Sequence, residues 1–190
     1  MRIEKDNIVI RSATIDDAVQ LNKWWNDGKV MEHAGFPNGV GESLEDTIKN
    51  IKSREGKLND LCIIEIDGKA VGELSYSFKD NTAYPGWKIC DPDYQNKGYG
   101  TKIINILFEF LFTDERINSQ NPIDKIRWDT MLENKRAQHV YETKIGARKI
   151  AIHENIWRNQ LGNLRTAVEY EITREEFFNK TFKGRQSYGK

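Results

Sequence analysis

One short segment constrains what this chain can fold into more than any other. Residues 95–101 read QNKGYGT and run directly into a helix pattern with its apolar side chains on one face. The first N–H groups of a helix have no partners within the helix, and the helix dipole adds partial positive charge there. Because Gly98 and Gly100 have no Cβ, the backbone can approach an anion closely. The segment therefore predicts a phosphate-binding loop at a helix N-terminus.

Two common phosphate motifs do not fit this segment. A Rossmann fingerprint needs a third glycine three residues after the second, where this chain has Ile103. A Walker A loop ends in Gly-Lys-Ser/Thr, whereas here Thr101 follows Gly100 directly. On local grounds alone, a tight turn that uses glycine only for its shape explains the segment equally well.

The order of the remaining patterns predicts a mixed-sheet α/β (α+β) fold. Alternating or β-branched runs predict strands at residues 8–12, 61–66, 70–78, 83–90, 125–131, 148–157 and 164–173. Helices are predicted after the caps Thr14, Ser43 and Thr173, after the 95–101 segment, and at 136–145. We expect a mostly antiparallel, twisted sheet of about seven strands flanked by helices. Pro85 predicts that strand 83–90 is irregular there or lies at an edge.

Composition narrows the class of protein. The 190 residues suit one domain, with a core at about 8–173 and a short C-terminal helix and polar tail at 174–190. The chain is 31% charged and 38% hydrophobic, which is typical of a soluble globular protein. Its net charge of zero argues against a nucleic-acid binder. Its three histidines lack metal-ligand spacing, so we expect no metal.

The N-terminal pattern and the two cysteines bear on location. Residues 1–7 are polar and charged with no apolar stretch behind them, so we expect no ordinary signal peptide. No apolar run has the length of a membrane span, and Cys62 and Cys90 lie outside any CxxC motif. We therefore expect a cytoplasmic monomer or homodimer that does not bind membranes.

Four features together resemble the GNAT superfamily of N-acetyltransferases. The 95–100 pattern, Gln-x-x-Gly-x-Gly, is similar to that family's acetyl-CoA pyrophosphate loop, and 87–92 (WKICDP) resembles the strand and turn before it. Segment 134–147, with Asn134 and Tyr141, resembles the family's later motif, although it ends in Gly-Ala where Gly-Phe is usual. The final strand pair matches the usual ending. The resemblance covers nearly the whole chain and is closest to the branch with ribosomal-protein, spermidine and some aminoglycoside acetyltransferases.

The resemblance implies that acetyl-CoA, as co-substrate, lies in a splayed central strand pair and pairs with the preceding strand as an extra strand would. The residues that it places along acetyl-CoA are Ile89, Cys90, Asp91, Gln95, Asn96, Lys97, Gly98, Tyr99, Gly100, Thr101 and Asn134. It also implies that the irregular segment 29–41 lines the acceptor pocket. The large or aromatic side chains that border this segment are Trp24, Trp25, Met31, His33 and Phe36. At least one of the tryptophans suits a helix core.

By the same resemblance, an amine attacks the thioester directly in a ternary complex, and Tyr141 protonates the leaving thiolate. Because a thiol pKa of about 8.5 makes that help modest, loss of Tyr141 is expected to slow turnover rather than abolish it. No residue clearly matches a catalytic base. Glu73 is the first candidate, with Asp80 and Glu133 as others, and an ordinary surface carboxylate is the alternative for each. Cys90 as a nucleophile has no adjacent histidine, so a small buried residue explains it better.

We expect acetyl transfer to a primary amine of a small molecule, such as a polyamine, an amino sugar or an aminoglycoside. One alternative is an enzyme that acetylates a protein N-terminus or lysine. Another is a non-catalytic acyl-CoA-binding module, which the presence of Tyr141 and Asn134 argues against and the lack of a clear base favours weakly.

Overall fold

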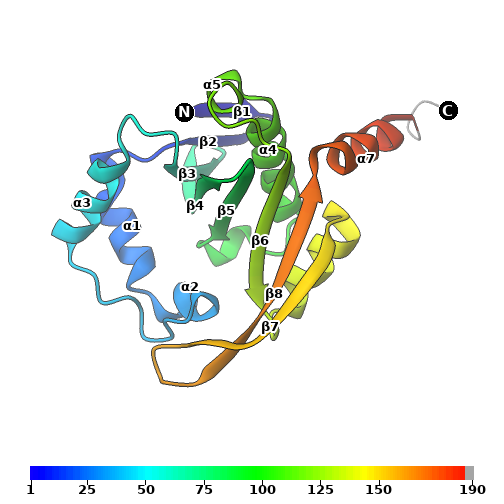
Figure 1. Cartoon of the computed structure of the whole chain (residues 1–190). Coiled ribbons are helices and arrows are strands. Elements are labelled where there is room, and N and C mark those ends of the chain that lie inside the picture. The colour runs from blue at the N-terminus through cyan, green and yellow to red at the C-terminus, as the bar shows by residue number, and fades with distance from the viewer. Residues whose placement is uncertain (187–190) are drawn as a thin grey trace.

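The computed structural model describes residues 1–186 and arranges them as a sheet with helices on both faces (Figure 1). Within these residues the sheet has eight strands in the order β1-β2-β3-β4-β5-β6-β8-β7. Neighbouring strands there are antiparallel except for the parallel pair β5–β6. The predicted mixed, mostly antiparallel fold is confirmed. Residues 187–190 of the predicted polar tail lie outside the described residues.

The elements follow the chain in alternating groups of strands and helices. The strands are β1 (Arg2–Lys5), β2 (Ile8–Ser12), β3 (Asp60–Ile66), β4 (Lys69–Lys79), β5 (Thr82–Ile89), β6 (Lys125–Met131), β7 (Arg148–Arg158) and β8 (Leu164–Thr173). The helices are α1 (Ala18–Trp25), α2 (Gly28–Met31), α3 (Leu44–Arg54), α4 (Tyr99–Thr113), α5 (Glu115–Asn118), α6 (Lys135–His139) and α7 (Arg174–Gln186). The short turns are η1 (Ile15–Asp17), η2 (Glu32–Ala34), η3 (Pro92–Tyr94) and the π-helical η4 (Val140–Ile145).

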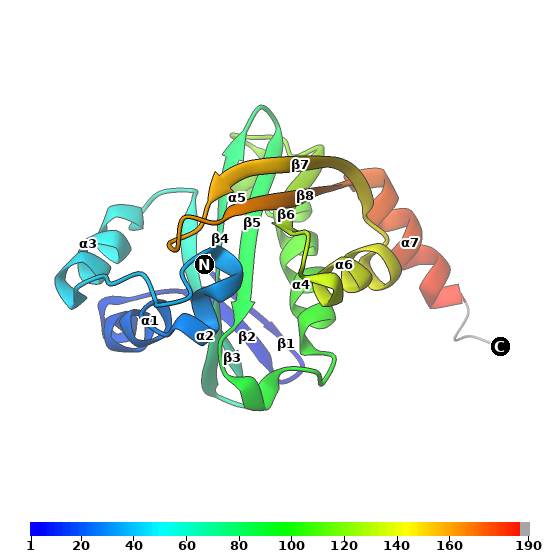
Figure 2. The same ribbon diagram turned by 90° about the horizontal axis from the view of Figure 1, so that it is seen from below.

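Figure 2 shows the layers from below: α1–α3 lie on one side of the sheet, and α4, α6 and α7 lie on the other. A smaller apolar cluster, which includes Leu21 and Ile63, packs under α1 and α3. A larger one fills the space beneath α4. There the rings of Phe108 in α4 and Trp128 in β6 lie 5.0 Å apart between centroids, so α4 packs on both halves of the sheet.

The strands β5 and β6 separate in the middle of the sheet. In the described chain they pair at Thr82↔Lys125 and Ala83↔Ile126, and their ladder extends no further. Beyond this junction β5 stays paired with β4, and β6 stays paired with β8. Pro85 therefore lies where β5 has an edge free of β6, a position that tolerates proline. This divergence is the splayed central pair that the sequence analysis expects.

The structure differs from the sequence prediction at several elements. Strand β1 is not predicted because its exposed, charged side chains show no apolar alternation; pairing with β2 creates it. Segment 29–41, expected to be irregular, contains α2 and η2. The helix expected at 136–145 changes from α6 to the π-helical η4 partway along. The predicted caps are confirmed at Thr14, Ser43 and Thr173.

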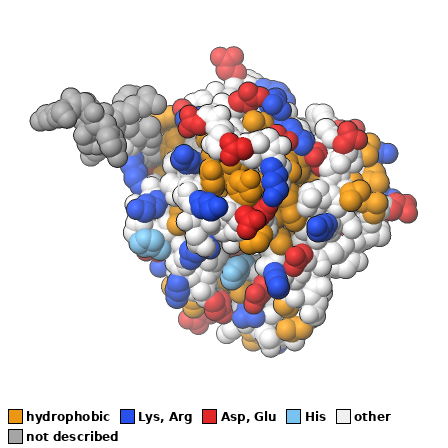
Figure 3. Space-filling view, turned by 180° about the vertical axis from the view of Figure 1, so that it is seen from behind, with side chains coloured by type: hydrophobic (Ala, Val, Ile, Leu, Met, Phe, Trp, Pro, Cys, Tyr) orange, Lys and Arg blue, Asp and Glu red, His pale blue; other side chains and the backbone are white. Residues whose placement is uncertain are grey.

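The face shown in Figure 3 has no large patch of a single charge sign. Lys and Arg side chains are interspersed there with Asp and Glu, and hydrophobic side chains gather near the centre. Among residues 1–186, no helix has the length and apolar character that crossing a bilayer requires.

Candidate functional site

A cavity of about 290 Å³ lies at the open end of the splay between β5 and β6. Four regions distant in sequence line it. From the β5 and β6 sides these are Pro85, Gly86, Trp87, Lys88, Trp128, Asp129, Thr130 and Met131. From outside the two strands they are His33, Ala34, Asn134, Tyr141 and Trp157. The splay thus brings Tyr141 and Asn134 together with residues from both ends of the chain.

The loop before α4 has the geometry of an anion site. Gly98 takes the left-handed conformation at φ 81°, and no side chain of the described chain caps the α4 N-terminus. A Cβ added at Gly98 or Gly100 would meet no described atom within 4 Å. Packing within the protein therefore does not explain glycine at Gly100. Open space above uncapped N–H groups fits the pyrophosphate of acetyl-CoA.

Internal bonds fix this loop to the end of β5. The Gln95 side-chain amide donates to the Ile89 carbonyl at 2.8 Å. The Asp91 carboxylate accepts from Lys69 at 2.8 Å and from the Asp93 amide at 2.9 Å. The hydrogen bond from Lys69 is the largest cause that lowers the pKa of Asp91. Gln95 and Asp91 thus brace the loop, and their contact with acetyl-CoA stays a prediction.

The residues between strand and loop are also engaged within the protein. The amides of Cys90 and Asp91 both donate to the Val71 carbonyl, at 2.8 and 2.9 Å. The Cys90 side chain is 5% exposed, and burial raises the pKa of its thiol to about 12. Cys90 is therefore a protonated thiol at neutral pH, which agrees with its reading as a small buried residue.

Lys97, Asn96, Tyr99 and Thr101 complete the predicted loop. Asn96 takes a positive φ of 60°, and Lys97 is exposed. Tyr99 packs against Tyr94 with ring centroids 6.0 Å apart. Thr101 lies in the first turn of α4. Their roles toward acetyl-CoA stay predictions.

Tyr141 lies in the π-helical turn η4, and π-helical turns occur frequently at functional sites. Its ring packs edge-on against Trp128 and Tyr170, with centroids 5.5 and 5.3 Å away. Its hydroxyl forms no hydrogen bond with any described residue. Burial raises the pKa of Tyr141, and the charge of Asp129 adds to the shift. At neutral pH the hydroxyl is therefore a proton-bearing donor at the cavity wall.

Asn134 caps α6 while it lines the cavity. Its side-chain oxygen accepts from the Ala137 amide at 3.2 Å, and its NH₂ group donates to Thr130 at 3.2 Å. One N–H of the amide is left for a further acceptor.

The structure separates the carboxylates that the sequence analysis considers as bases. Glu73 is 5% exposed, forms a 2.7 Å ion pair with Lys88 and does not line the cavity. Asp80 lies at the β4–β5 turn, beside the joined end of β5 and β6, and Glu133 is exposed and 3.4 Å from Arg165. Among the cavity residues of the described chain, Asp129 is the one carboxylate.

Asp129 is a cavity residue that is not among the candidates from the sequence, although the alternation of side chains along β6 indicates which face it occupies. Trp128 is buried in the core, and successive strand residues point to opposite faces, so Asp129 points the other way. That face belongs to the cavity only because β6 diverges from β5.

A contact that we name the clasp borders the cavity at its lining residue Trp157: Gly35, Asn38 and Gly39 lie against Trp157 and Gln160. A Cβ added at Gly35 would lie 2.4 Å from the Trp157 ring, so only glycine fits beneath it. The Gln160 amide donates to the Gly35 carbonyl at 2.8 Å. Its side chain accepts from the Asn38 amide at 3.0 Å and donates to the Gly39 carbonyl at 2.9 Å.

The residues expected around the acceptor pocket divide into two groups. His33 lines the cavity. Trp24, Trp25 and Met31 belong to the smaller core cluster, which accounts for both tryptophans as helix core, and Phe36 is 38% exposed. Among residues 1–186, no group of three or more His, Cys, Asp or Glu side chains could hold a metal ion.

A family model and several solved structures match this chain over most of its length. A family model described as the acetyltransferase (GNAT) domain matches residues 7–148. A GNAT-family acetyltransferase from Bacillus anthracis is 23% identical over 93% of this chain and 100% of that one, with a TM-score of 0.74. Spermidine N-acetyltransferase from Vibrio cholerae, in complex with CoA and spermine, is 16% identical over 92% and 99%, with a TM-score of 0.77. A ribosomal L7/L12 α-N-protein acetyltransferase, in complex with coenzyme A, is 14% identical over 93% and 99%, also at 0.77.

Proposed function

The chain belongs to the GNAT acetyltransferase family, and from that premise we propose that it transfers the acetyl group of acetyl-CoA to a primary amine of a small molecule. Family membership makes the chain an acetyl-CoA-dependent N-acetyltransferase, so the proposal concerns the acceptor and the residues. The non-catalytic alternative is set aside on the same ground.

The clasp is the observation that carries the choice of acceptor. It ties residues 35–39 to the β7–β8 hairpin beside the cavity, through Trp157 above Gly35 and the bonds of Gln160. The cavity volume of about 290 Å³ is near the lower end of small-molecule sites. A compact amine fits that space, whereas the chain end of a folded protein would have to pass the clasp beside it.

The protein-acceptor alternative is favoured by one of the similar structures, which is a ribosomal-protein acetyltransferase. Another is a spermidine acetyltransferase, so the neighbours point to both classes. The clasp favours the small molecule.

Tyr141 is the proposed donor to the leaving sulfur. It bears its proton at neutral pH and reaches the cavity from a wall of packed rings. Acetyl-CoA supplies the thioester, whose sulfur takes up negative charge as the bond to the acetyl group breaks. A neutral hydroxyl held there stabilises that charge. Asn134 would hold the substrate arm with its free N–H, and the first turn of α4 would hold the pyrophosphate.

A thiol-release assay tests the proposal. Acetyl-CoA is offered with polyamines, aminoglycosides, amino acids and N-terminal peptides, and free CoA is measured. We expect release with one small-amine class, and we expect Tyr141→Phe to lower kcat by about 10- to 100-fold without abolishing turnover. Tyr170→Phe is the matched control, because it removes a nearby hydroxyl that bonds Glu142 outside the cavity. Release with peptides alone would overturn the small-molecule acceptor.

A further inference from the structure

The amine acceptor carries a proton that must leave before the nitrogen can attack. With a pKa of about 10.4, roughly one alkyl amine in 2,500 is neutral at pH 7, which corresponds to about 4.6 kcal/mol. A carboxylate within reach of the ammonium would lower this barrier. Glu73, the first candidate from the sequence, is held by Lys88 outside the cavity.

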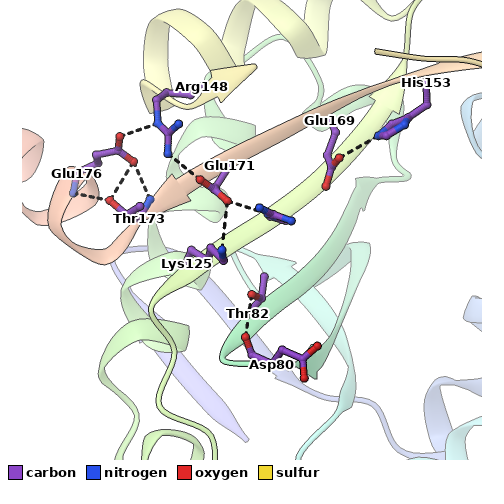
Figure 4. A network of polar contacts seen from close by, with 10 residues as sticks. Asp80, Thr82, Lys125, Arg148, His153, Glu169, Glu171, Thr173 and Glu176 are labelled. Carbon is purple, nitrogen blue, oxygen red and sulfur yellow. Dashed lines mark hydrogen bonds and ion pairs between the residues drawn. The ribbon is translucent and has the colours of Figure 1, made fainter. Parts of the chain in front are cut away.

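Asp129 differs from the other carboxylates on its face of the sheet. Figure 4 shows the β8 side chains Glu171 and Glu169 with their partners. Glu171 bonds Arg127 at 2.7 Å and Arg148 at 2.6 Å, and Glu169 lies 2.9 Å from His153. Asp129 forms no ion pair with any described residue, and it lines the cavity.

The register places Asp129 directly opposite Glu169. The two residues pair across β6 and β8, so their side chains share one face. Asp129 is exposed at the cavity, and partial desolvation by the surrounding protein raises its pKa; the charge of Glu169 adds to the shift, and His153 opposes it. A carboxylate whose pKa is raised holds a proton more readily than a free one, which suits a base.

The same geometry ties Asp129 to the reacting atoms. Asp129 and Tyr141 both line the cavity, and the charge of Asp129 contributes to the raised pKa of Tyr141. The other titratable cavity residues are His33, on the turn η2 at the rim, and Lys88, which is paired with Glu73. Of these side chains, Asp129 is held on the more rigid backbone, because β6 is paired with β8 along its whole length.

We propose that Asp129 is the general base that takes a proton from the acceptor ammonium, a role that rests on the proposed function. The Asp129 carboxylate accepts one proton, and the freed electron pair of nitrogen forms the N–C bond to the acetyl carbon. The C–S bond breaks with its electrons on sulfur, which takes the proton of Tyr141. The second nitrogen proton restores Tyr141, and Asp129 releases its proton to solvent.

The test compares Asp129→Asn with wild type across pH, using the amine that the thiol-release assay identifies. We expect kcat/KM for the amine to fall about 100- to 1,000-fold at pH 7, with KM for acetyl-CoA unchanged. The deficit should shrink as pH rises, because the amine loses its proton to water, and it should be smaller for an amine of lower pKa. Glu133→Gln is the matched control, since it removes an exposed carboxylate near the end of the same strand.

Folding does not confound this test. Because Asp129 is exposed and forms no ion pair with a described residue, Asp129→Asn should leave Tm nearly unchanged. If the pH profile of kcat/KM for Asp129→Asn superimposes on that of wild type, the role of Asp129 is wrong while the proposed function stands. The role of Asp129 is also wrong if kcat/KM comes to depend on deprotonation of the free amine in His33→Gln and not in Asp129→Asn. A wild type that releases no CoA with any amine would overturn the proposed function, and this inference with it.

Discussion

The substitution Gln160→Ala tests the clasp most directly. The change removes two side-chain hydrogen bonds, to the Asn38 amide at 3.0 Å and to the Gly39 carbonyl at 2.9 Å. It leaves the main-chain bond to Gly35 in place. Because both lost bonds are at least partly exposed, each contributes toward the lower end of about 0.5–1.5 kcal/mol. The closed clasp should therefore lose about 1–2 kcal/mol, which is a factor of about 5–30 in its equilibrium with open forms.

Two independent measurements report this change in the equilibrium between closed and open forms of the clasp. Amide hydrogen exchange in residues 35–39 should accelerate about 5- to 30-fold in Gln160→Ala. KM for the acceptor should rise by up to the same factor, while KM for acetyl-CoA stays constant because the two lost bonds go to Asn38 and Gly39 and neither reaches the predicted acetyl-CoA loop at residues 95–101. Leu161→Ala is the matched control: Leu161 lies in the same turn and is 58% exposed, and the substitution keeps the hydrogen bond that its main-chain amide donates to the Asn159 side chain. Unchanged exchange in Gln160→Ala, or equal effects in both variants, would refute the role of the clasp.

Two further predictions concern the loop and the pH range of the fold. Gly100→Val should raise KM for acetyl-CoA while the free energy of unfolding changes by less than about 1 kcal/mol, because its side chain enters open space; steady-state kinetics and denaturant melts measure both, and an unchanged KM would count against a pyrophosphate there. Burial alone would raise the pKa of Asp17, but hydrogen bonds from Arg11 and Thr14 outweigh it and lower the pKa below its ordinary 3.8. Asp17 therefore stabilises the fold above about pH 4 and loses that contribution as pH falls. The stability difference between wild type and Asp17→Asn should be present at pH 7 and shrink progressively as pH falls below about 4; a constant difference would contradict the pairing.

Local chemistry made the shape of the 95–101 loop predictable from sequence, whereas its link to acetyl-CoA came from the family resemblance. Gly98 and Gly100 before an apolar helix need no tertiary information, because helix termini and glycine act within a few residues. The caps at Thr14 and Ser43 belong to the same class. The splayed strand pair followed from the family resemblance, with Pro85 as a consistent local sign.

The remaining features depend on contacts between residues distant in sequence, so they could not be predicted from local patterns. Asp129 becomes a cavity residue through the divergence of β6 from β5, and its distinctive surroundings come from Glu169 on β8. Nothing near Gln160 in sequence indicates that it bonds Asn38 and Gly39, more than 100 residues earlier. A strand such as β1 forms because β2 offers it an edge, and its own residues show no strand pattern.

The narrow junction between β5 and β6 makes the molecule divisible. Cutting the backbone in residues 119–124, between α5 and β6, yields one fragment with the 95–101 loop and α4 and another with Asn134 and Tyr141. Neither fragment contains the whole cleft. Phe108 of α4 and Trp128 of β6 lose their shared burial when the fragments part, so apolar association drives the two pieces back together. Acetyl transfer would then report that the two fragments have reunited, without help from any fused partner.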